Sequence, residues 1–197
     1  MSQRVYLGLV ALGPVDPEIV RRLRAAVAKT LGLPVKVLRP RPLPEKTFHI
    51  VRGQHHSTQL LEYLLSAEEA GAFRILGITA VDLYIPILTF VFGEAQLSGR
   101  AAIISLFRPR GDADGSNPPP ALVLKRLIKL SIHELGHTLG LGHCREEGCL
   151  MGFSANLEKL DQKSPAFCQY CQVLLGDFFQ EHHLTPRLKR YAGTPSP

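Results

Sequence analysis

The sequence has no apolar run approaching the roughly 18 residues that a helix needs to cross a bilayer. Its apolar stretch near the start, residues 4–12, is too short for a signal peptide and lacks the flanking residues of one. No internal repeat is visible, and 197 residues are too few for two large domains. These absences predict a cytoplasmic protein without membrane association, folded as one domain with at most a small appendage.

Cysteine is scarce, and its placement is informative. The four cysteines Cys144, Cys149, Cys168 and Cys171 form one C-x4-C pair and one C-x2-C pair. Because thiols stay reduced in the cytoplasm, these pairs predict metal ligands before disulfides. Two local disulfides are the alternative interpretation.

Acidic residues are outnumbered by basic ones, 17 to 23, which gives a formal charge of +6. The basic residues are spread over several segments instead of forming one patch. Solvated helix faces and chain ends account for such a distribution, so the charge does not favour nucleic acid as a partner. The hydrophobic content of 45% and the charged content of 20% are typical of a globular protein.

The first part of the chain predicts a strand, a helix and a second strand, over residues 3–11, 14–34 and 35–38. This order favours a parallel sheet with a right-handed crossover. A second helix is predicted over residues 57–70, where a Ser-Thr start precedes a helical apolar pattern.

The middle of the chain predicts three more strands, over residues 74–85, 89–95 and 101–107, the last two joined by a turn. In the loop 108–120, a D-x-D-G fragment lacks the downstream ligand of a calcium loop, so no calcium site is expected. A long, mostly apolar helix over residues 121–140 and a final helix over residues 164–183 complete the pattern.

The long helix carries a histidine cluster. His133 and His137 are four residues apart, so both rings can turn toward one point. Gly140 ends the helix and lets the chain bend, so that His143 can approach that point from another direction. Three neutral imidazoles suit a zinc ion with Zn to N distances of about 2.0–2.1 Å and leave a fourth position open for water. An open position is typical of a catalytic zinc site.

Glu134 follows the first ligand, about 100° further round the helix. From there its carboxylate can reach water at the metal and act as general base in the attack on a polarised carbonyl. Passing that proton to the leaving nitrogen would complete the hydrolysis of an amide.

These residues resemble a known family. The metzincin metallopeptidase motif is matched by His133, Glu134, His137, Gly140 and His143, and Met151 falls where that clan has its Met-turn. With the spacing C-x4-C-x-M and C-x2-C, residues 131–171 resemble the archaemetzincins, whereas the first 110 residues resemble them only in their general plan. The resemblance implies a zinc peptidase acting on peptides or proteins. It also implies a sheet edge above the cleft, within residues 89–107, where an extended substrate could add as a strand.

The four cysteines supply enough thiolates to close a tetrahedral zinc site, with Zn to S distances of about 2.3 Å. No position would remain open, so this second ion is expected to be structural and to fix the segment after His143 to the final helix. Met151 is expected to pack beneath the histidines, because a thioether is a poor zinc ligand beside imidazoles.

An oxyanion stabiliser is harder to find. Some metzincins place a tyrosine just after the Met-turn, but here Gly152 and Phe153 follow Met151. Tyr170 is the nearest alternative for this role, although a tyrosine on an amphipathic helix can equally be a packing residue. The histidines outside the motif are expected at the surface; they are His49, His55, His56, His182 and His183.

We therefore predict an α/β (α+β) chain in which residues 1–143 form a metzincin-like twisted mixed sheet with helices, ending in the active-site helix. Residues 144–190 are expected to form a small C-terminal subdomain stapled by zinc, and residues 191–197 a flexible tail. The predicted function is that of a monomeric zinc metallopeptidase with one catalytic and one structural zinc ion. The alternative is a non-catalytic zinc-binding protein that interacts with nucleic acid or a protein partner.

Overall fold

The computed structural model describes residues 5–66, 71–111 and 117–186, and its centre is a five-stranded sheet. In spatial order the strands are β2 (Val35–Val37), β1 (Tyr6–Leu12), β5 (Ala72–Thr79), β8 (Ala101–Ser105) and β7 (Gly93–Ala95). The first four pair in parallel, whereas β7 pairs antiparallel with β8 and forms one edge. The predicted mixed sheet is confirmed.

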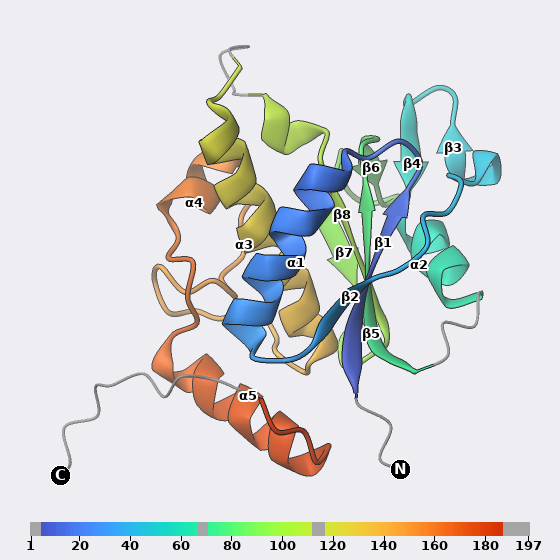
Figure 1. The fold of residues 1–197 in the computed structure, drawn as a ribbon. Coiled ribbons are helices and arrows are strands. Elements are labelled where there is room, and N and C mark those ends of the chain that lie inside the picture. Colours follow the sequence, from blue (N-terminus) through green and yellow to red (C-terminus); the bar gives the residue numbers. More distant parts are fainter. Residues whose placement is uncertain (1–4, 67–70, 112–116, 187–197) are drawn as a thin grey trace, which may run out of the picture.

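Helices cover both faces of this sheet. Helices α1 (Pro17–Leu31) and α3 (Pro120–Thr138) lie on one face, and α2 (Ser57–Ser66) lies on the other (Figure 1). Alternate side chains of β1 supply the two cores: Leu7 and Leu9 pack with α1 and α3, and Val10 and Leu12 pack with α2. A central strand buried on both faces must be apolar throughout, which explains the continuous apolar run at the start of the sequence.

The helix ends follow local chemistry. The Asp16 side chain accepts a hydrogen bond from the Glu18 N–H at 2.8 Å, and Gly32, with φ 67°, ends α1 in the left-handed region. The helix is therefore shorter than the predicted 14–34. Helix α3 agrees with the predicted 121–140 to within two residues at each end, and much of it is buried, as expected. The last predicted residues of α2, 67–70, lie outside the described residues.

A second, three-stranded sheet was not predicted. It consists of β3 (Phe48–His49), β4 (Gln54–His56) and β6 (Leu83–Tyr84), and the 3₁₀ helix η1 (Glu45–Thr47) precedes it. The prediction of a single strand over residues 74–85 is therefore wrong: β5 ends at Thr79, and Leu83 and Tyr84 belong to the second sheet. The buried Asp82 carboxylate accepts two hydrogen bonds from Arg108, at 2.8 and 2.7 Å, which fixes the chain where it leaves β5.

The remaining elements are the 3₁₀ helix η2 (Arg108–Arg110) and the helices α4 (Leu157–Gln162) and α5 (Gln169–Glu181). Helix α4 was not predicted, and α5 begins five residues later than the predicted final helix. The acidic loop fragment 112–115 and the tail 191–197 lie outside the described residues. Within the described residues, no helix combines the length and apolar character that a membrane span requires.

Candidate metal centres and active site

The end of α3 and the bend beyond it bring the three motif histidines together. Gly140 has φ 86°, in the left-handed region that favours glycine, and the Leu141 N–H donates to the Gly136 carbonyl at 3.0 Å. The chain therefore folds back against the helix end. The imidazoles of His133, His137 and His143 have ring centroids 4.6, 5.4 and 4.9 Å apart, and one nitrogen of each lies within 4.8 Å of the others.

Backbone carbonyls orient two of these rings. His133 Nδ1 lies 2.8 Å from the Leu150 carbonyl, and His137 Nδ1 lies 2.7 Å from the Leu141 carbonyl. A carbonyl can only accept, so each Nδ1 carries the proton and each Nε2 keeps a lone pair. The two Nε2 atoms are 3.1 Å apart, close to the about 3.3 Å expected between two nitrogen ligands of tetrahedral zinc. Two lone pairs that face each other at this distance fit a cation between them.

Burial keeps the candidate ligands neutral. It lowers the pKa of His133 from 6.5 to about 3, and it also lowers the pKa of His137 and of His143. Neutral imidazole is the form that binds a metal ion. The residues present therefore fit the zinc that the motif predicts.

Glu134 lies beside the histidines, and its side chain is buried against β7. Burial raises the pKa of its carboxyl from 4.5 to about 8, and the negative charge of Glu94 acts in the same direction. A Cβ atom on Gly93 would lie 2.8 Å from Glu134 Cγ and 2.9 Å from its Oε1. Gly93 therefore leaves the space that this carboxylate occupies. The sequence reasoning missed Gly93, although a glycine inside a strand is a sign of close approach by another group.

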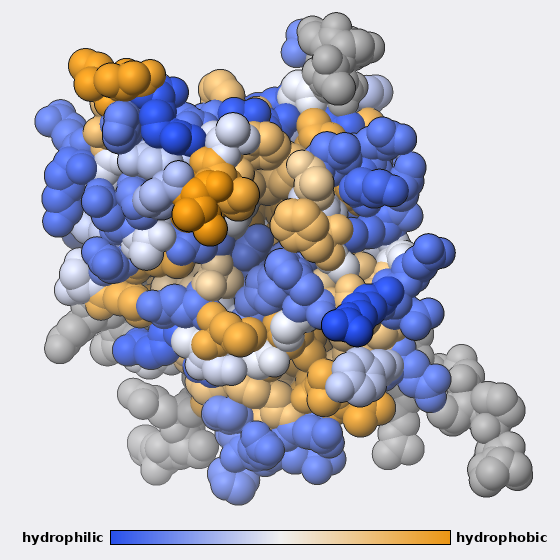
Figure 2. Space-filling model, turned by 180° about the vertical axis from the view of Figure 1, so that it is seen from behind, coloured by the Kyte–Doolittle hydropathy of each residue, from blue (hydrophilic) through white to orange (hydrophobic). Residues whose placement is uncertain are grey.

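A cavity of about 380 Å³ opens beside these groups. Three parts of the chain line it: residues 88–95, the end of α3 with His143, and the segment from Phe153 to Lys163. Phe153 is 65% exposed, and its ring contacts that of His143 with centroids 5.5 Å apart. Figure 2 shows separate apolar patches with polar side chains between them on that face of the molecule. The cavity thus joins the imidazoles to solvent through a partly apolar rim.

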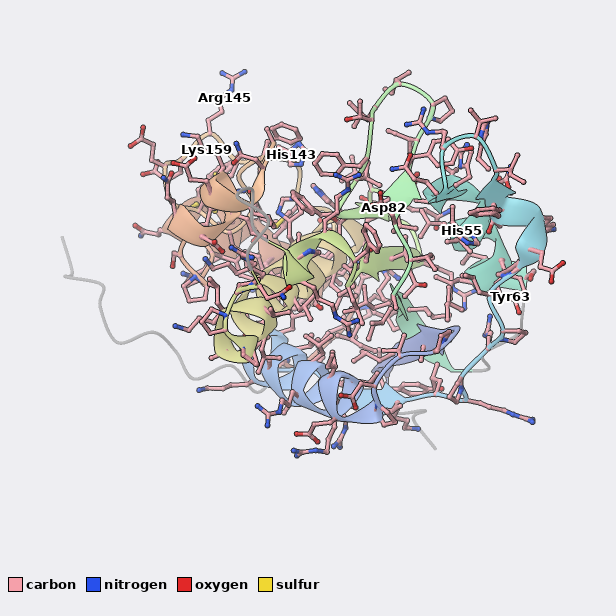
Figure 3. All side chains as sticks on the ribbon, turned by 90° about the horizontal axis from the view of Figure 1, so that it is seen from above. His55, Tyr63, Asp82, His143, Arg145 and Lys159 are labelled. Carbon is pink, nitrogen blue, oxygen red and sulfur yellow. The ribbon has the colours of Figure 1, made fainter. Side chains whose placement is uncertain are left out.

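Hydrogen bonds from the second sheet hold one wall of the cavity. Arg52 donates to the carbonyls of Leu88 and Thr89 at 2.8 and 3.0 Å, and Gln54 donates to Asp82 and to the Thr89 carbonyl at 2.9 and 3.0 Å. Figure 3 shows Asp82 between the labelled His55 and His143 in that view. The unpredicted sheet therefore positions residues that line the site.

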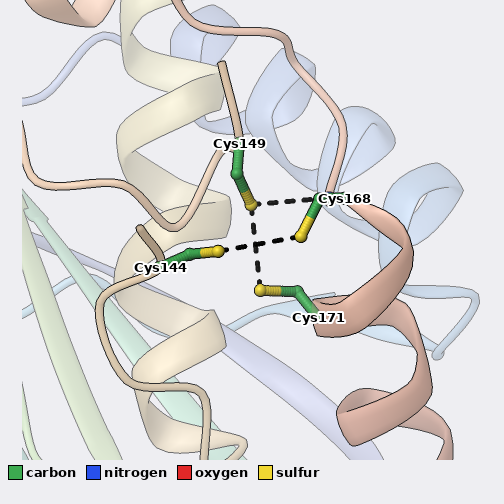
Figure 4. A group of neighbouring side chains, drawn as sticks. All are labelled: Cys144, Cys149, Cys168 and Cys171. Atoms are coloured by element: carbon green, nitrogen blue, oxygen red, sulfur yellow. Dashed lines mark hydrogen bonds between the residues drawn. The ribbon is translucent and has the colours of Figure 1, made fainter. Parts of the chain in front are cut away.

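The four cysteines form a second cluster (Figure 4). The sulfur atoms of Cys144 and Cys168 are 3.7 Å apart, and those of Cys149 and Cys171 are 3.8 Å apart. About 3.8 Å is the separation expected between two sulfurs bound to one tetrahedral zinc ion. Two backbone N–H groups also point at the cluster, since those of Glu146 and Cys168 donate to sulfur at 3.4 Å. All four thiols are free, so the disulfide alternative does not describe this structure.

Met151 lies between the two clusters. It is fully buried, and a Cβ atom on Gly136 would lie 2.6 Å from its sulfur, so Met151 packs directly against α3. Its carbonyl accepts a hydrogen bond from the Cys144 N–H at 2.9 Å. These contacts agree with a packing position beneath the histidines.

Two expectations fail. Tyr170 is 68% exposed on α5 and is not among the residues that line the cavity, so the structure does not bring it to the site. His55 was expected at the surface but is 8% exposed, and its Nδ1 shares a hydrogen bond with Thr47 Oγ1 at 2.8 Å. A buried imidazole with one such partner has no sequence signal of its own.

Lys163 is a lining residue that the sequence did not single out. It follows α4, and its ammonium donates to the Gly152 carbonyl. Its position depends on how α4 packs, and no spacing pattern in the sequence indicates that.

Comparison with known proteins shows that the chain is a zinc metallopeptidase. It belongs to peptidase family M54, whose family model matches residues 14–176. The archaemetzincin of Methanopyrus kandleri is 44% identical over 164 residues, covering 82% of this chain and 89% of that protein. The resemblance to archaemetzincins is thus confirmed.

Solved structures agree. The crystal structure of the Methanopyrus kandleri archaemetzincin has a TM-score of 0.80 and 41% identity, covering 91% of this chain and 97% of that one. A zinc-dependent peptidase from Methanocorpusculum labreanum has a TM-score of 0.76 and 30% identity, covering 86% of this chain and 99% of that one. The fold class predicted from the sequence is confirmed.

Proposed function

We propose that this chain hydrolyses peptide bonds at the cavity beside α3, with zinc held by His133, His137 and His143 and with Glu134 as general base. The observation that carries the proposal is the convergence of three neutral imidazoles next to a buried carboxylate in a solvent-connected cavity. Zinc, when bound, polarises a carbonyl and acidifies water.

Glu134 is suited to move a proton. Burial and the charge of Glu94 raise the pKa of this carboxyl group, which makes its carboxylate a stronger proton acceptor than that of an exposed glutamate. It would accept the proton of the attacking water and pass it to the leaving nitrogen. Gly93 leaves the space beside β7 that the carboxylate occupies.

The substrate would lie along β7. This strand is the edge of the five-stranded sheet, and its residues line the cavity. An extended peptide could therefore add there as a further strand, held by main-chain hydrogen bonds. This agrees with the sheet edge expected within residues 89–107.

The proposal includes a second, structural zinc ion bound by Cys144, Cys149, Cys168 and Cys171. It also includes the division into a catalytic part, residues 1–143, and a C-terminal subdomain, residues 144–190. The cluster joins the segment after His143 to the start of α5, and its sulfur positions suit a closed tetrahedral site. The monomeric state and the cytoplasmic location stay predictions of the sequence.

The test uses zinc-replete full-length protein and a broad peptide library, with cleavage read by mass spectrometry. We expect cleavage by the wild type, and a loss of about 10³-fold or more in Glu134→Gln with both zinc ions retained, because the amide cannot accept the proton. Glu147→Gln, which changes an exposed carboxylate, is the matched control and should cut normally. Undiminished cleavage by Glu134→Gln would exclude the general-base role. The absence of any cleavage by the wild type would favour the non-catalytic alternative.

A further inference from the structure

The cavity beside the histidines has several apolar lining residues and one ammonium group. Leu130, Leu160 and Ala155 line it together with Lys163. Lys163 is the only lysine or arginine among the lining residues. A substrate group that enters the cavity therefore meets apolar side chains and a single ammonium, in addition to the histidines and the carboxyl groups of Glu94 and Glu134.

The Lys163 ammonium has a fixed place and spare hydrogen-bonding capacity. It donates to the Gly152 carbonyl, and its Nζ lies 3.6 Å from where a Cβ atom of Gly152 would be. An ammonium has three donors, and the carbonyl uses one of them. Among residues 5–66, 71–111 and 117–186, no carboxylate lies within ion-pair distance of Lys163. The two remaining donors are thus not taken by an acidic side chain of the described chain.

The surroundings of Lys163 make an unpaired charge costly. Lys163 is half-buried, and this burial lowers the pKa of its ammonium from 10.5 to about 8. A negative ligand in the same cavity would relieve this cost. A carboxylate bound there would gain a charge-assisted hydrogen bond in partly desolvated surroundings, where such bonds are strongest.

Lys163 could instead serve the cysteines. Its charge also acts on Cys149, so it could offset the negative charge of four thiolates on one zinc ion. However, the hydrogen bond of its Nζ goes to the Gly152 carbonyl, and no bond from Nζ to sulfur is present within the described part of the chain. Its place among the cavity-lining residues favours a ligand in the cavity.

We propose that Lys163 is a specificity-determining residue that binds a substrate carboxylate, from an acidic side chain or from the C-terminus of the substrate, beside the three histidines. The inference rests on the proposed function of the same cavity and names its substrate class. An acidic residue or a chain end close to the scissile bond would be preferred over the corresponding amide.

The test compares matched peptides that differ only in one carboxylate. Glu is paired with Gln and Asp with Asn at each position around a cleaved bond, and a free C-terminus is paired with its amide. We expect kcat/KM to favour the carboxylate by about 10- to 100-fold at one position. The side-chain pairs and the C-terminal pair distinguish the two sources of the carboxylate.

Variants locate the preference at Lys163. Lys163→Met should abolish it, Lys163→Arg should retain most of it, and Lys163→Glu should reverse it toward Lys or Arg in the substrate. Lys159→Met is the matched control, because Lys159 is exposed on α4 and does not line the cavity; it should behave like the wild type (Figure 3). Zinc content and melting temperature are measured for each variant.

A binding assay separates this inference from the proposed function. Zinc-replete Glu134→Gln protein is titrated with the same peptide pairs, with and without Lys163→Met. A Lys163-dependent preference for carboxylates in binding, with no cleavage by the wild type, would support Lys163 while overturning the peptidase. Cleavage without any difference between acid and amide pairs would overturn Lys163 alone. So would a Lys163→Met variant that loses one zinc equivalent and keeps the substrate preference.

Discussion

The histidine and cysteine clusters use similar numbers of ligands in opposite ways. The histidines project from the end of α3 and the bend after it, and they line a cavity. The cysteines come from a loop and the start of α5, and none of them lines that cavity. One arrangement leaves room for a substrate and the other does not. Contact with a cavity, together with ligand geometry, therefore distinguishes the proposed catalytic site at the histidines from the proposed structural site at the cysteines.

The two clusters also differ in what holds them without metal. The histidine rings are oriented by backbone carbonyls and by the packed core around α3. The segment around the cysteines is short, and its buried apolar side chains join the core that α1 and α3 share; they are Leu150, Met151, Leu160, Phe167, Leu175 and Phe179. A zinc ion bound by the cysteines, as proposed, would add to the stability of this segment.

The largest expected effects come from two separate variants, each of which removes one ligand from one cluster. Cys171→Ser should lose one zinc equivalent and lower the free energy of unfolding by on the order of 5 kcal/mol, since structural zinc binding is coupled to folding. That corresponds to a fall of about 10–20 °C in melting temperature for a chain of this size. His137→Ala, the matched variant, should also lose one equivalent and all turnover, but with a much smaller change in melting temperature. Equal destabilisation by the two variants would contradict the comparison.

Gly93→Ala should impair the site at the histidines and leave the cysteine cluster intact. The new methyl group would meet the Ile103 carbonyl at 2.6 Å and the Glu134 carboxylate at 2.9 Å, so the Glu134 side chain must shift. We expect a loss of about 1–3 kcal/mol in stability and at least a tenfold loss in kcat, with both zinc ions retained. Gly176→Ala on α5, where no atom lies within 4 Å of the added Cβ, is the control and should not reduce turnover. An unchanged kcat in Gly93→Ala would show that Glu134 does not need this position.

The pH dependence of stability should separate the two buried groups of the site. The folded-state pKa of His133, about 3, lies below its ordinary 6.5, so the unfolded state binds the extra proton and stability falls as the pH drops from 6.5 toward 3. For Glu134 the folded-state value, about 8, lies above 4.5, so the folded state binds the proton and stability falls as the pH rises from 4.5 to 8. Urea unfolding tests this, with protein that carries zinc at the cysteines and none at the histidines. Between pH 4.5 and 8, the free energy of unfolding of Glu134→Gln should rise relative to that of the wild type. Free energies of unfolding that change with pH in the same way in both proteins would contradict the assignment.

The smallest expected effect is that of Met151→Leu. The exchange nearly conserves volume, so we expect less than about 1.5 kcal/mol of destabilisation. Both zinc equivalents should remain, and kcat should stay within a few-fold of the wild type. Metal analysis and steady-state kinetics check this. Loss of zinc from this variant would show that Met151 does more than pack.

Local patterns predicted the parts of the structure that are local. The helix spacing of His133 and His137, the bend at Gly140 and the central strands all follow from periodicity and from glycine chemistry. The second sheet has strands of two or three residues, too short to show a period. Gly93 and Lys163 matter because of what distant segments bring near them. A glycine within a strand is a sign of such an approach at Gly93, whereas no pattern in the sequence marks Lys163. Tyr170 failed for the same reason, since its spacing from Cys171 says nothing about which way α5 faces.

The stretch from His143 to Leu150 belongs to both clusters at once. Cys144 adjoins a nitrogen ligand, and Cys149 adjoins the carbonyl that orients His133. The two clusters therefore share one short segment of the chain. A displacement of Cys144 or Cys149 would also move His143 or the Leu150 carbonyl, so that a disturbance of one cluster would reach the other.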